Sequence, residues 1–189
     1  RTFMKKLLSL LLCALMLLSL ANAESVVQPK PAAERASTSN LIASVKTTLK
    51  KKMATRSGPG TRFTSTGTYP KSTEVTAIEK YDVNGTYWVL VEFKHKDARY
   101  RAYTGLKRLK ASSSEIPNAN YTSKKAKIDT ETTISYGPGT NYAAYKKKLA
   151  VGTEIKVVGV ESGYAHVDVN YRGKVRRGYI PEGTFSYIP

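Results

Sequence analysis

The sequence has few of the side chains that most enzymes and metal sites require. Among its 189 residues there is one cysteine, Cys13, and only two are histidine. Cys13 lies in an apolar N-terminal run, so the remainder of the chain has no thiol to form a disulfide, attack a substrate or bind a metal. The chain contains neither a His-Glu-x-x-His nor a Gly-x-Ser-x-Gly motif. We therefore expect a protein that is not an enzyme and has no cofactor or metal.

Acidic residues are also scarce. The chain has 14 Asp and Glu residues against 31 Lys and Arg residues, a formal net charge of +17. A basic protein outside the cell attracts polyanions, and salt weakens that attraction. A high net charge also keeps a protein soluble without any binding role. The composition is compatible with both interpretations.

The N-terminus has the three parts of a secretory signal peptide. Lys5 and Lys6 precede an apolar run from Leu7 to Leu20, and Ala21-Asn22-Ala23 forms an A-x-A cleavage site. The run is short for a membrane span. We expect residues 1–23 to be removed, which takes away three basic and no acidic residues and lowers the net charge from +17 to +14. The mature chain would then be secreted, associated with the cell envelope and without a transmembrane anchor.

The chain contains an internal repeat. Gly-Pro-Gly-Thr occurs at Gly58–Thr61 and again at Gly137–Thr140, and an aromatic residue follows each copy at the same distance, Phe63 and Tyr142. Later segments also correspond, although insertions near turns change the offset from 79 to 80 and then to 76. Repetition of an ordered set of motifs indicates a duplicated module.

Both copies are predicted to be all-β. Glu74–Lys80 and Thr153–Val160 are rich in Val, Ile and Thr, as strands are. Asn84-Gly85 and Ser162-Gly163 are typical of hairpin turns. The segment Leu41–Leu49 fits either a strand or a short helix. The expected organisation is a flexible spacer over 24–41, a first barrel over 42–110, a linker over 111–120 and a second barrel over 121–189.

The order of these motifs resembles that of the bacterial SH3-like domain, often called SH3b. The residues that carry the resemblance are Arg56–Phe63, Trp88 and Val91 in the first copy, and Tyr136–Tyr142, Gly152, Thr153, Tyr164, Val167, Gly178 and Tyr179 in the second. The first copy departs from the family pattern at Ser72, Ala102 and Thr104. The resemblance implies two tandem small SH3-like β-barrels with a binding role. In secreted bacterial proteins and wall hydrolases, such domains hold the protein to peptidoglycan or to its peptide bridges.

Aromatic residues near the repeated loop are the candidate ligand contacts. The glycines themselves are interpreted as a turn that the barrel needs, because glycine adopts positive φ freely. Tyr136, Asn141 and Tyr142 surround the second loop, where the first copy has Ser57, Arg62 and Phe63, so the two copies need not bind the same ligand. The full set of candidates is Tyr136, Asn141, Tyr142, Tyr145, Arg56, Arg62, Phe63 and Tyr69.

Basic clusters supply a second set of candidates. Such runs are commonly solvated surfaces, but on a wall-binding protein they would contact the phosphates of wall polymers. The candidates for polyanion contact are Lys146, Lys147, Lys148, Arg172, Lys174, Arg176 and Arg177. His166 and Asp168 are predicted to share one face of a strand, with no third metal ligand in view.

These observations predict a secreted, non-catalytic protein that binds the bacterial cell wall through peptidoglycan peptide or glycan and through wall polyanions. The alternative is an extracellular adaptor that binds another secreted or surface protein. The signal peptide argues against nucleic acid as the physiological partner.

Overall fold

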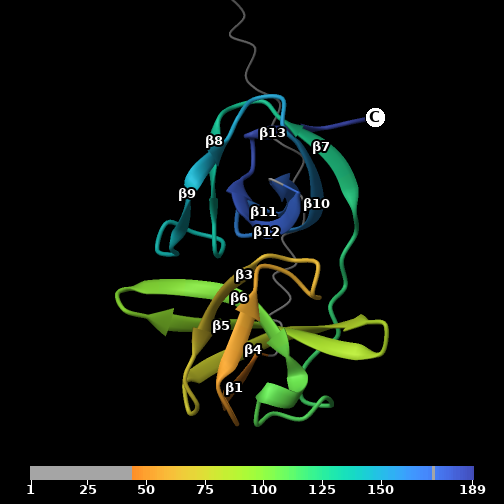
Figure 1. Cartoon of the computed structure of the whole chain (residues 1–189). Coiled ribbons are helices and arrows are strands. Elements are labelled where there is room, and N and C mark those ends of the chain that lie inside the picture. The colour runs from red at the N-terminus through yellow and green to blue at the C-terminus, as the bar shows by residue number, and fades with distance from the viewer. Residues whose placement is uncertain (1–43, 172) are drawn as a thin grey trace, which may run out of the picture. The chain divides into compact units, whose positions relative to one another are not determined.

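The computed structural model describes residues 44–171 and 173–189, which form β-strands and one short 3-10 turn, η1 (Leu106–Arg108) (Figure 1). The predicted all-β fold is confirmed. The predicted signal peptide, Cys13, the spacer over 24–41 and Arg172 lie outside the described residues. Within the described ranges, no helix has the length and apolar character needed to cross a membrane.

Residues 45–105 form a six-stranded antiparallel sheet, which with its loops is called the first module. The segment for which strand and short helix were both open contains a strand. The spatial order is β1-β4-β5-β6-β2-β3. The strands are β1 (Val45–Thr48), β2 (Met53–Arg56), β3 (Ser65–Tyr69), β4 (Glu74–Val83), β5 (Thr86–His95) and β6 (Ala98–Gly105).

Residues 124–187 form a seven-stranded antiparallel sheet, which with its loops is called the second module. Its spatial order is β13-β7-β10-β11-β12-β8-β9, so that β9 ends this sheet as the equivalent strand β3 ends the first. The strands are β7 (Lys124–Ile128), β8 (Thr132–Ser135), β9 (Ala144–Leu149), β10 (Glu154–Glu161), β11 (Tyr164–Tyr171), β12 (Lys174–Pro181) and β13 (Phe185–Tyr187).

Both predicted hairpin turns are present. Asn84 and Gly85 join β4 to β5 with φ of 51° and 75°, and Ser162 and Gly163 join β10 to β11 with φ of 52° and 77°. Two successive residues with positive φ are the signature of a type I′ turn, whose twist matches that of the strands it joins. The Asn-Gly and Ser-Gly pairs therefore fix the register of each central hairpin.

The repeated Gly-Pro-Gly loop is explained by the aromatic residue that follows it. A Cβ atom on Gly58 would lie 2.3 Å from the Phe63 ring, and one on Gly137 would lie 2.2 Å from the Tyr142 ring. No side chain fits in that space, since non-bonded carbon atoms require about 3.5–4.0 Å. Each aromatic ring thus packs directly on the backbone of the first glycine, which makes the motif a structural unit of the module.

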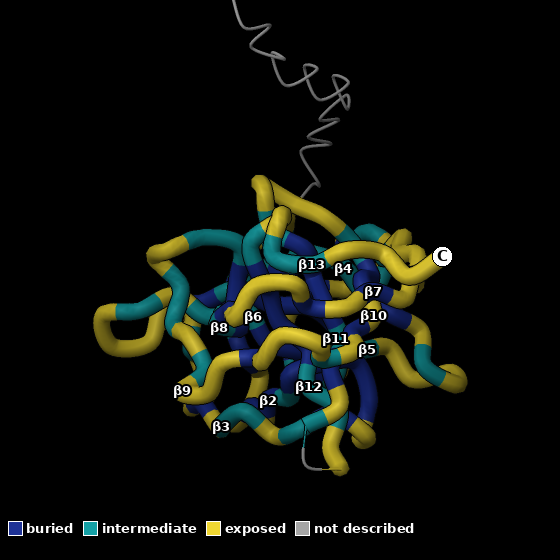
Figure 2. Tube along the Cα trace, turned by 90° about the horizontal axis from the view of Figure 1, so that it is seen from above, coloured by how far each residue is buried: buried dark blue, intermediate teal, exposed yellow. Residues whose placement is uncertain are grey.

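Alternating residues of the central strands form the core of each module, and the buried residues appear dark blue in Figure 2. In β5 the buried apolar residues Val89, Val91 and Phe93 face the core. In β11, Ala165 and Val167 take the corresponding positions. The residues between them, which a lone module would expose to water, point to the opposite face of the sheet.

The linker over 111–120 packs on the first module. Ile116 is buried with the core residues of that module. The backbone N–H of Lys80 donates to the carbonyl of Pro117 at 2.8 Å, and the N–H of Ala119 donates to the carbonyl of Lys80 at 2.8 Å. The Lys80 ammonium also donates to the carbonyls of Ser113 and Ile116. The linker therefore adds both apolar and hydrogen-bonded contacts to β4.

The outer faces of the central strands carry equivalent ion pairs. In the first module Arg101 Nε lies 2.8 Å from a Glu92 carboxylate oxygen, and in the second Arg177 Nε lies 2.5 Å from an Asp168 oxygen. Glu92 corresponds to Asp168 and Arg101 to Arg177 at the same offset of 76. The duplication has thus kept one cross-strand ion pair in each copy.

These faces pack against each other through reciprocal contacts, which define the intermodule interface. Arg101 donates to the Tyr179 hydroxyl at 3.3 Å, and Arg177 donates to the equivalent Tyr103 hydroxyl at 3.5 Å. The backbone contacts repeat in the same way, because Phe63 bridges Val175 and Tyr142 bridges Arg99. Such reciprocity is the mark of a two-fold interface between identical subunits, here formed within one chain.

Candidate functional site

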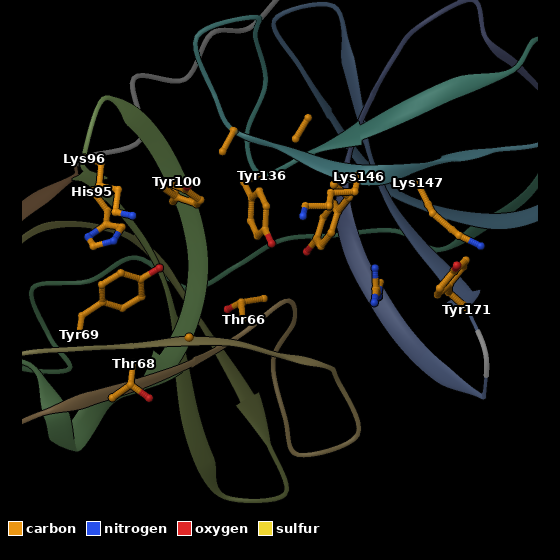
Figure 3. Close-up of a pocket in the computed structure, with 15 residues that line it drawn as sticks. Thr66, Thr68, Tyr69, His95, Lys96, Tyr100, Tyr136, Lys146, Lys147 and Tyr171 are labelled. Carbon is orange, nitrogen blue, oxygen red and sulfur yellow. The ribbon is translucent and has the colours of Figure 1, made fainter.

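A cleft of about 750 Å³ lies between the modules and is the candidate binding site (Figure 3). Equivalent elements of the two copies line it: the sheet-ending strands β3 and β9, and the ends of the β5–β6 and β11–β12 hairpins. The lining residues are Thr66, Gly67, Thr68, Tyr69, His95, Lys96 and Tyr100 from the first module, and Tyr136, Ala143, Ala144, Tyr145, Lys146, Lys147, Tyr171 and Arg176 from the second.

Aromatic rings form the wall of the cleft from one module to the other. Tyr100 meets Tyr136 with ring centroids 5.1 Å apart, and Tyr136 stacks on Tyr145 at 4.3 Å. At the first-module end, the rings of Tyr69 and His95 lie 5.3 Å apart. In Figure 3 Tyr136 points into the space between Tyr100 and Lys146. Such a surface suits the flat face of a sugar or an extended peptide.

Cations occupy the second-module end. The Arg176 guanidinium carbon lies 4.7 Å from the Tyr171 ring centroid and 5.3 Å from that of Tyr145, and the Lys147 ammonium lies 5.8 Å from the Tyr171 ring. These are cation–π distances. Lys146 adds a further positive charge at this end, and Lys96 adds one from the first module. None of the lining residues is Asp or Glu.

The tyrosines do not offset this charge. Burial raises the pKa of Tyr69, of Tyr136 and of Tyr145 above the ordinary tyrosine value. The phenols are therefore neutral hydroxyl donors at physiological pH, because burial disfavours the charged phenolate. The cleft as a whole is positively charged with an aromatic wall.

Six of the residues predicted from the sequence line this cleft, namely Tyr69, Tyr136, Tyr145, Lys146, Lys147 and Arg176. Other predicted ligand contacts lie elsewhere. Phe63 is buried at 1% exposure in the intermodule interface, and the Arg56 guanidinium donates to the carbonyls of Thr61 and Phe63. Arg62 and Asn141 are exposed outside the cleft.

The other predicted polyanion contacts differ in their surroundings. Lys148 is paired with Glu131 at 2.8 Å, and Lys174 is exposed. Arg177 is 3% exposed and holds Asp168, because β12 turns it toward the first module while the preceding Arg176 faces the cleft. Arg172 lies outside the described residues.

Several cleft residues are not among the candidate contacts predicted from the sequence, including Tyr100, Tyr171, His95, Lys96 and Thr66. A signal for some of them was present in the repeat. At the offset of 76, His95 corresponds to Tyr171 and Tyr100 corresponds to Arg176. Each pair of partners touches within its own module, His95 with Tyr100 and Tyr171 with Arg176. At these equivalent positions, one copy has an aromatic ring where the other has a different ring or a cation. The two copies have therefore diverged on this surface.

Tyr142 joins the modules rather than lining the cleft. Its hydroxyl donates to a Glu92 carboxylate oxygen at 2.5 Å, and Arg99 and Arg101 lie over its ring. Burial, reinforced by Glu92, raises the pKa of Tyr142 to about 12. Burial alone would raise the pKa of Glu92, but hydrogen bonds from Tyr142 and Arg101 outweigh it and lower that pKa. These groups thus hold Glu92 ionised in the interface.

His166 is expected to make stability depend on pH. Its ring is buried and stacks on Tyr179 with centroids 4.2 Å apart. Burial, together with Arg177 and Arg101, lowers the pKa of His166 well below its ordinary value. Below about pH 6.5 the unfolded chain takes up a proton that the folded chain cannot. Stability should therefore fall between pH 6.5 and 5 by up to about 1.4 kcal/mol per pH unit.

The measurement is urea unfolding at several pH values for wild type and for His166→Phe, which keeps a ring and does not titrate. The slope should be smaller in His166→Phe than in wild type. Glu79, whose pKa burial raises, acts in the opposite direction but is common to both proteins. Equal slopes in wild type and His166→Phe would contradict the prediction.

No metal centre is apparent in the described ranges 44–171 and 173–189, where no three His, Cys, Asp or Glu residues are grouped to hold an ion. His166 and Asp168 do lie on one face of β11, facing the first module. Asp168 pairs there with Arg177, and Tyr179 covers the ring of His166.

Comparison with known proteins identifies no family. No family model and no curated protein sequence matches the chain. The solved structures that match include NlpC2 and NlpC1 from Trichomonas vaginalis, with 15% and 14% sequence identity and a TM-score of 0.31 each. The matches cover 78% and 80% of this chain and 49% and 48% of those proteins. The chain therefore spans about half the length of these proteins, and similarity at this level carries no argument about function.

Proposed function

We propose that this chain is a secreted, non-catalytic binding protein that engages the bacterial cell wall, and that its two modules are tandem SH3-like domains of the bacterial type. The proposal has support from the signal-peptide pattern, the ordered motifs found twice and the net charge of +17. Peptidoglycan peptide or glycan is the proposed ligand, with wall polyanions as a further contact. No cofactor takes part.

The shared cleft is the observation that carries this proposal. It combines five tyrosines and four Lys or Arg residues and has no acidic residue among those that line it. Aromatic faces bind extended peptides and sugar rings, whereas clustered cations bind carboxylate or phosphate. Bacterial cell walls present all of these groups on one polymer. Since both modules contribute lining residues, the duplication itself creates the site.

Retention on purified sacculi tests the proposal. Wild type should sediment with sacculi at physiological salt and be released as salt rises, because screening weakens exposed charge contacts. Lys146→Gln combined with Lys147→Gln should bind roughly tenfold more weakly, since both lysines are exposed and each exposed ion pair contributes about 0.2–1 kcal/mol. Soluble wall fragments should not accumulate during the incubation, because the protein is proposed to be non-catalytic.

The matched control is Lys125→Gln combined with Lys127→Gln, which removes the same charge from exposed positions on β7 outside the cleft. This control should be retained like wild type. Equal losses in both double variants would mean that net charge alone drives binding. Absence of retention of the wild type at physiological salt would rule out the proposed function.

A protein-interaction adaptor is the second candidate. The observation that favours it is the presence of two sheet-ending strands, β3 and β9, in the walls of the cleft. A peptide from another protein can extend a sheet by pairing with such a strand. In that case wild type would bind a surface or secreted protein and would not sediment with sacculi.

A further inference from the structure

Arg176 is held in an unusual setting for an arginine. Its guanidinium lies over two rings, those of Tyr145 and Tyr171, and within residues 44–171 and 173–189 no carboxylate forms an ion pair with it. Its Nε is buried with no hydrogen-bond acceptor in reach among the described residues. Arg99, Arg101 and Arg177, by contrast, each bind a carboxylate. Arg176 is thus a positioned guanidinium in the cleft that lacks an anionic partner.

A guanidinium fixed in this way favours a planar oxyanion. Its donors match the two oxygens of a carboxylate, and stacking on rings limits the rotamers that must be ordered when the ligand binds. Lys146 and Lys147 line the same part of the cleft, and no carboxylate in the described part of the chain forms an ion pair with either of them. The second-module end of the cleft is therefore complementary to an acidic group.

The first-module end is different in character. Thr66, Thr68 and Tyr100 contribute hydroxyl groups, and Lys96 is the one Lys or Arg residue that this module adds to the lining. The equivalent of Tyr100 in the second module is Arg176. The cleft is therefore polar but weakly charged at one end and strongly cationic at the other, which gives a bound chain a preferred direction.

Strand β9 supplies a backbone surface beside the cationic end. It is the last strand of its sheet, so one side of Ala144–Leu149 has no neighbouring strand in the described part of the chain. The unpaired N–H and C=O groups of such a strand can bind an extended peptide. A sugar or phosphate polymer lacks the alternating amide groups that this pairing requires, which favours a peptide as the occupant.

We infer that the cleft binds an extended acidic peptide that pairs with the free edge of β9 and places a carboxylate on Arg176, with Lys146 and Lys147 beside it. This inference rests on the proposed function and specifies its ligand. Two sources share this chemistry, the peptide portion of a cell-wall polymer and an acidic segment of an extracellular protein.

Calorimetric titration with capped hexapeptides, matched to the six residues of β9, tests the inference. A peptide of alternating Glu and Thr should bind, and its Gln-Thr counterpart should bind at least tenfold more weakly. Arg176→Gln should reduce affinity for the acidic peptide by roughly tenfold or more, since a charged hydrogen bond is lost. Arg176→Lys should recover only part of it, because an ammonium cannot form the bidentate contact.

Strand pairing has its own readout. Methylation of alternate backbone nitrogens leaves the charge of the peptide unchanged but removes the N–H groups that would pair with β9. Of the two possible sets of alternate nitrogens, methylation of one set should therefore abolish binding. Peptide binding should also slow hydrogen exchange of the backbone amides of β9. Full affinity of both methylated peptides would overturn the pairing. Equal affinity of the Glu and Gln peptides, or an unchanged affinity of a folded Arg176→Gln variant, would overturn the role of Arg176.

Further arms separate this inference from the proposed function and identify the source. Retention on sacculi without affinity for any acidic peptide, or competition by polyphosphate alone, would leave wall binding intact and overturn the inference. Affinity for wall-derived peptides released by digestion supports a wall source. Affinity for the Glu-Thr peptide without retention on sacculi supports a protein segment and rules out wall binding.

Lysines on an edge strand also hinder self-association. Aggregation of the Lys146→Gln, Lys147→Gln variant with unchanged peptide affinity would assign those lysines to that role and contradict their place in the site.

Discussion

Replacement of Arg177 by alanine is expected to destabilise the protein by about 3–5 kcal/mol, because it leaves a charge without its partner inside the intermodule interface. Arg177 is 3% exposed and binds both oxygens of the Asp168 carboxylate, at 2.5 and 2.9 Å. It also donates to the Tyr103 hydroxyl and lies over the Phe63 ring at 5.2 Å. The loss is large compared with the roughly 5–15 kcal/mol that stabilises a typical domain.

Urea unfolding followed by the fluorescence of Trp88, the single tryptophan, measures this effect. Trp88 packs beside the interface cluster of Tyr81, Leu90 and Tyr103, so its emission should report separation of the modules. Lys174→Ala, an exposed change on the same strand, is the matched control and should have little effect. Arg177→Met combined with Asp168→Asn should recover part of the loss because no unpaired charge remains. A cost below about 1 kcal/mol for Arg177→Ala would show that water reaches Asp168 in the folded protein.

Phe63→Ala should cost about 3–5 kcal/mol of stability, the usual range for removal of a fully buried aromatic ring. The ring packs on Gly58 and under the Arg177 guanidinium, and the Phe63 backbone bridges Val175 of the other module. The variant would open a cavity at the interface and would also remove a cation–π contact. Ligand affinity per folded molecule should stay unchanged, because Phe63 does not line the cleft.

The same unfolding experiment, together with peptide titration, distinguishes a structural from a binding role for Phe63. Thr61→Ala, a change of an exposed residue in the same loop, serves as the control. Arg62 is unsuitable for that purpose because its guanidinium carbon lies 4.9 Å from the Phe63 ring centroid. Because Arg177 lies over the ring, Phe63→Ala and Arg177→Ala should not be additive when combined. Normal stability with lost ligand affinity would assign Phe63 to the binding site and contradict its buried position.

The fold was largely accessible from the sequence because its signals are local. The type I′ turns at Asn84-Gly85 and Ser162-Gly163 follow from residues that tolerate positive φ. The Gly-Pro-Gly repeat set the register between the copies. The structure adds the reason for it, which is the contact of Gly58 and Gly137 with the following aromatic ring.

The intermodule interface was not accessible in the same way. Strand alternation predicted that His166 and Asp168 share a face, but the identity of what covers that face depends on packing between residues far apart in the chain. Arg101 and Arg177 appear in the sequence as ordinary members of basic clusters. The two arginines are equivalent at the offset of 76. Each lies beside a carboxylate of its own module and opposite a tyrosine of the other module, and this packing buries both side chains.

The candidate site was predicted in part. The tyrosines near the second Gly-Pro-Gly loop were identified by their spacing, and Tyr136 and Tyr145 do line the cleft. Tyr142 instead hydrogen-bonds Glu92, since its ring is committed to covering Gly137. Tyr100 and Thr66 could not be selected, because only the association of the two modules brings them to the same cleft as Arg176.

The docked linker affects how the two modules can be studied apart. A fragment that stops at residue 110 would lack Ile116, which is 1% exposed, and would leave Lys80 without its acceptors from Ser113 and Ile116. Such a fragment would expose to water the apolar surface beside β4 that Ile116 covers in the whole protein. A fragment extended through Ala119 keeps these contacts, although its face that packs on the second module would be exposed to water. Limited proteolysis of the native chain should accordingly spare this connection, which is far less accessible than a free tether of the same length.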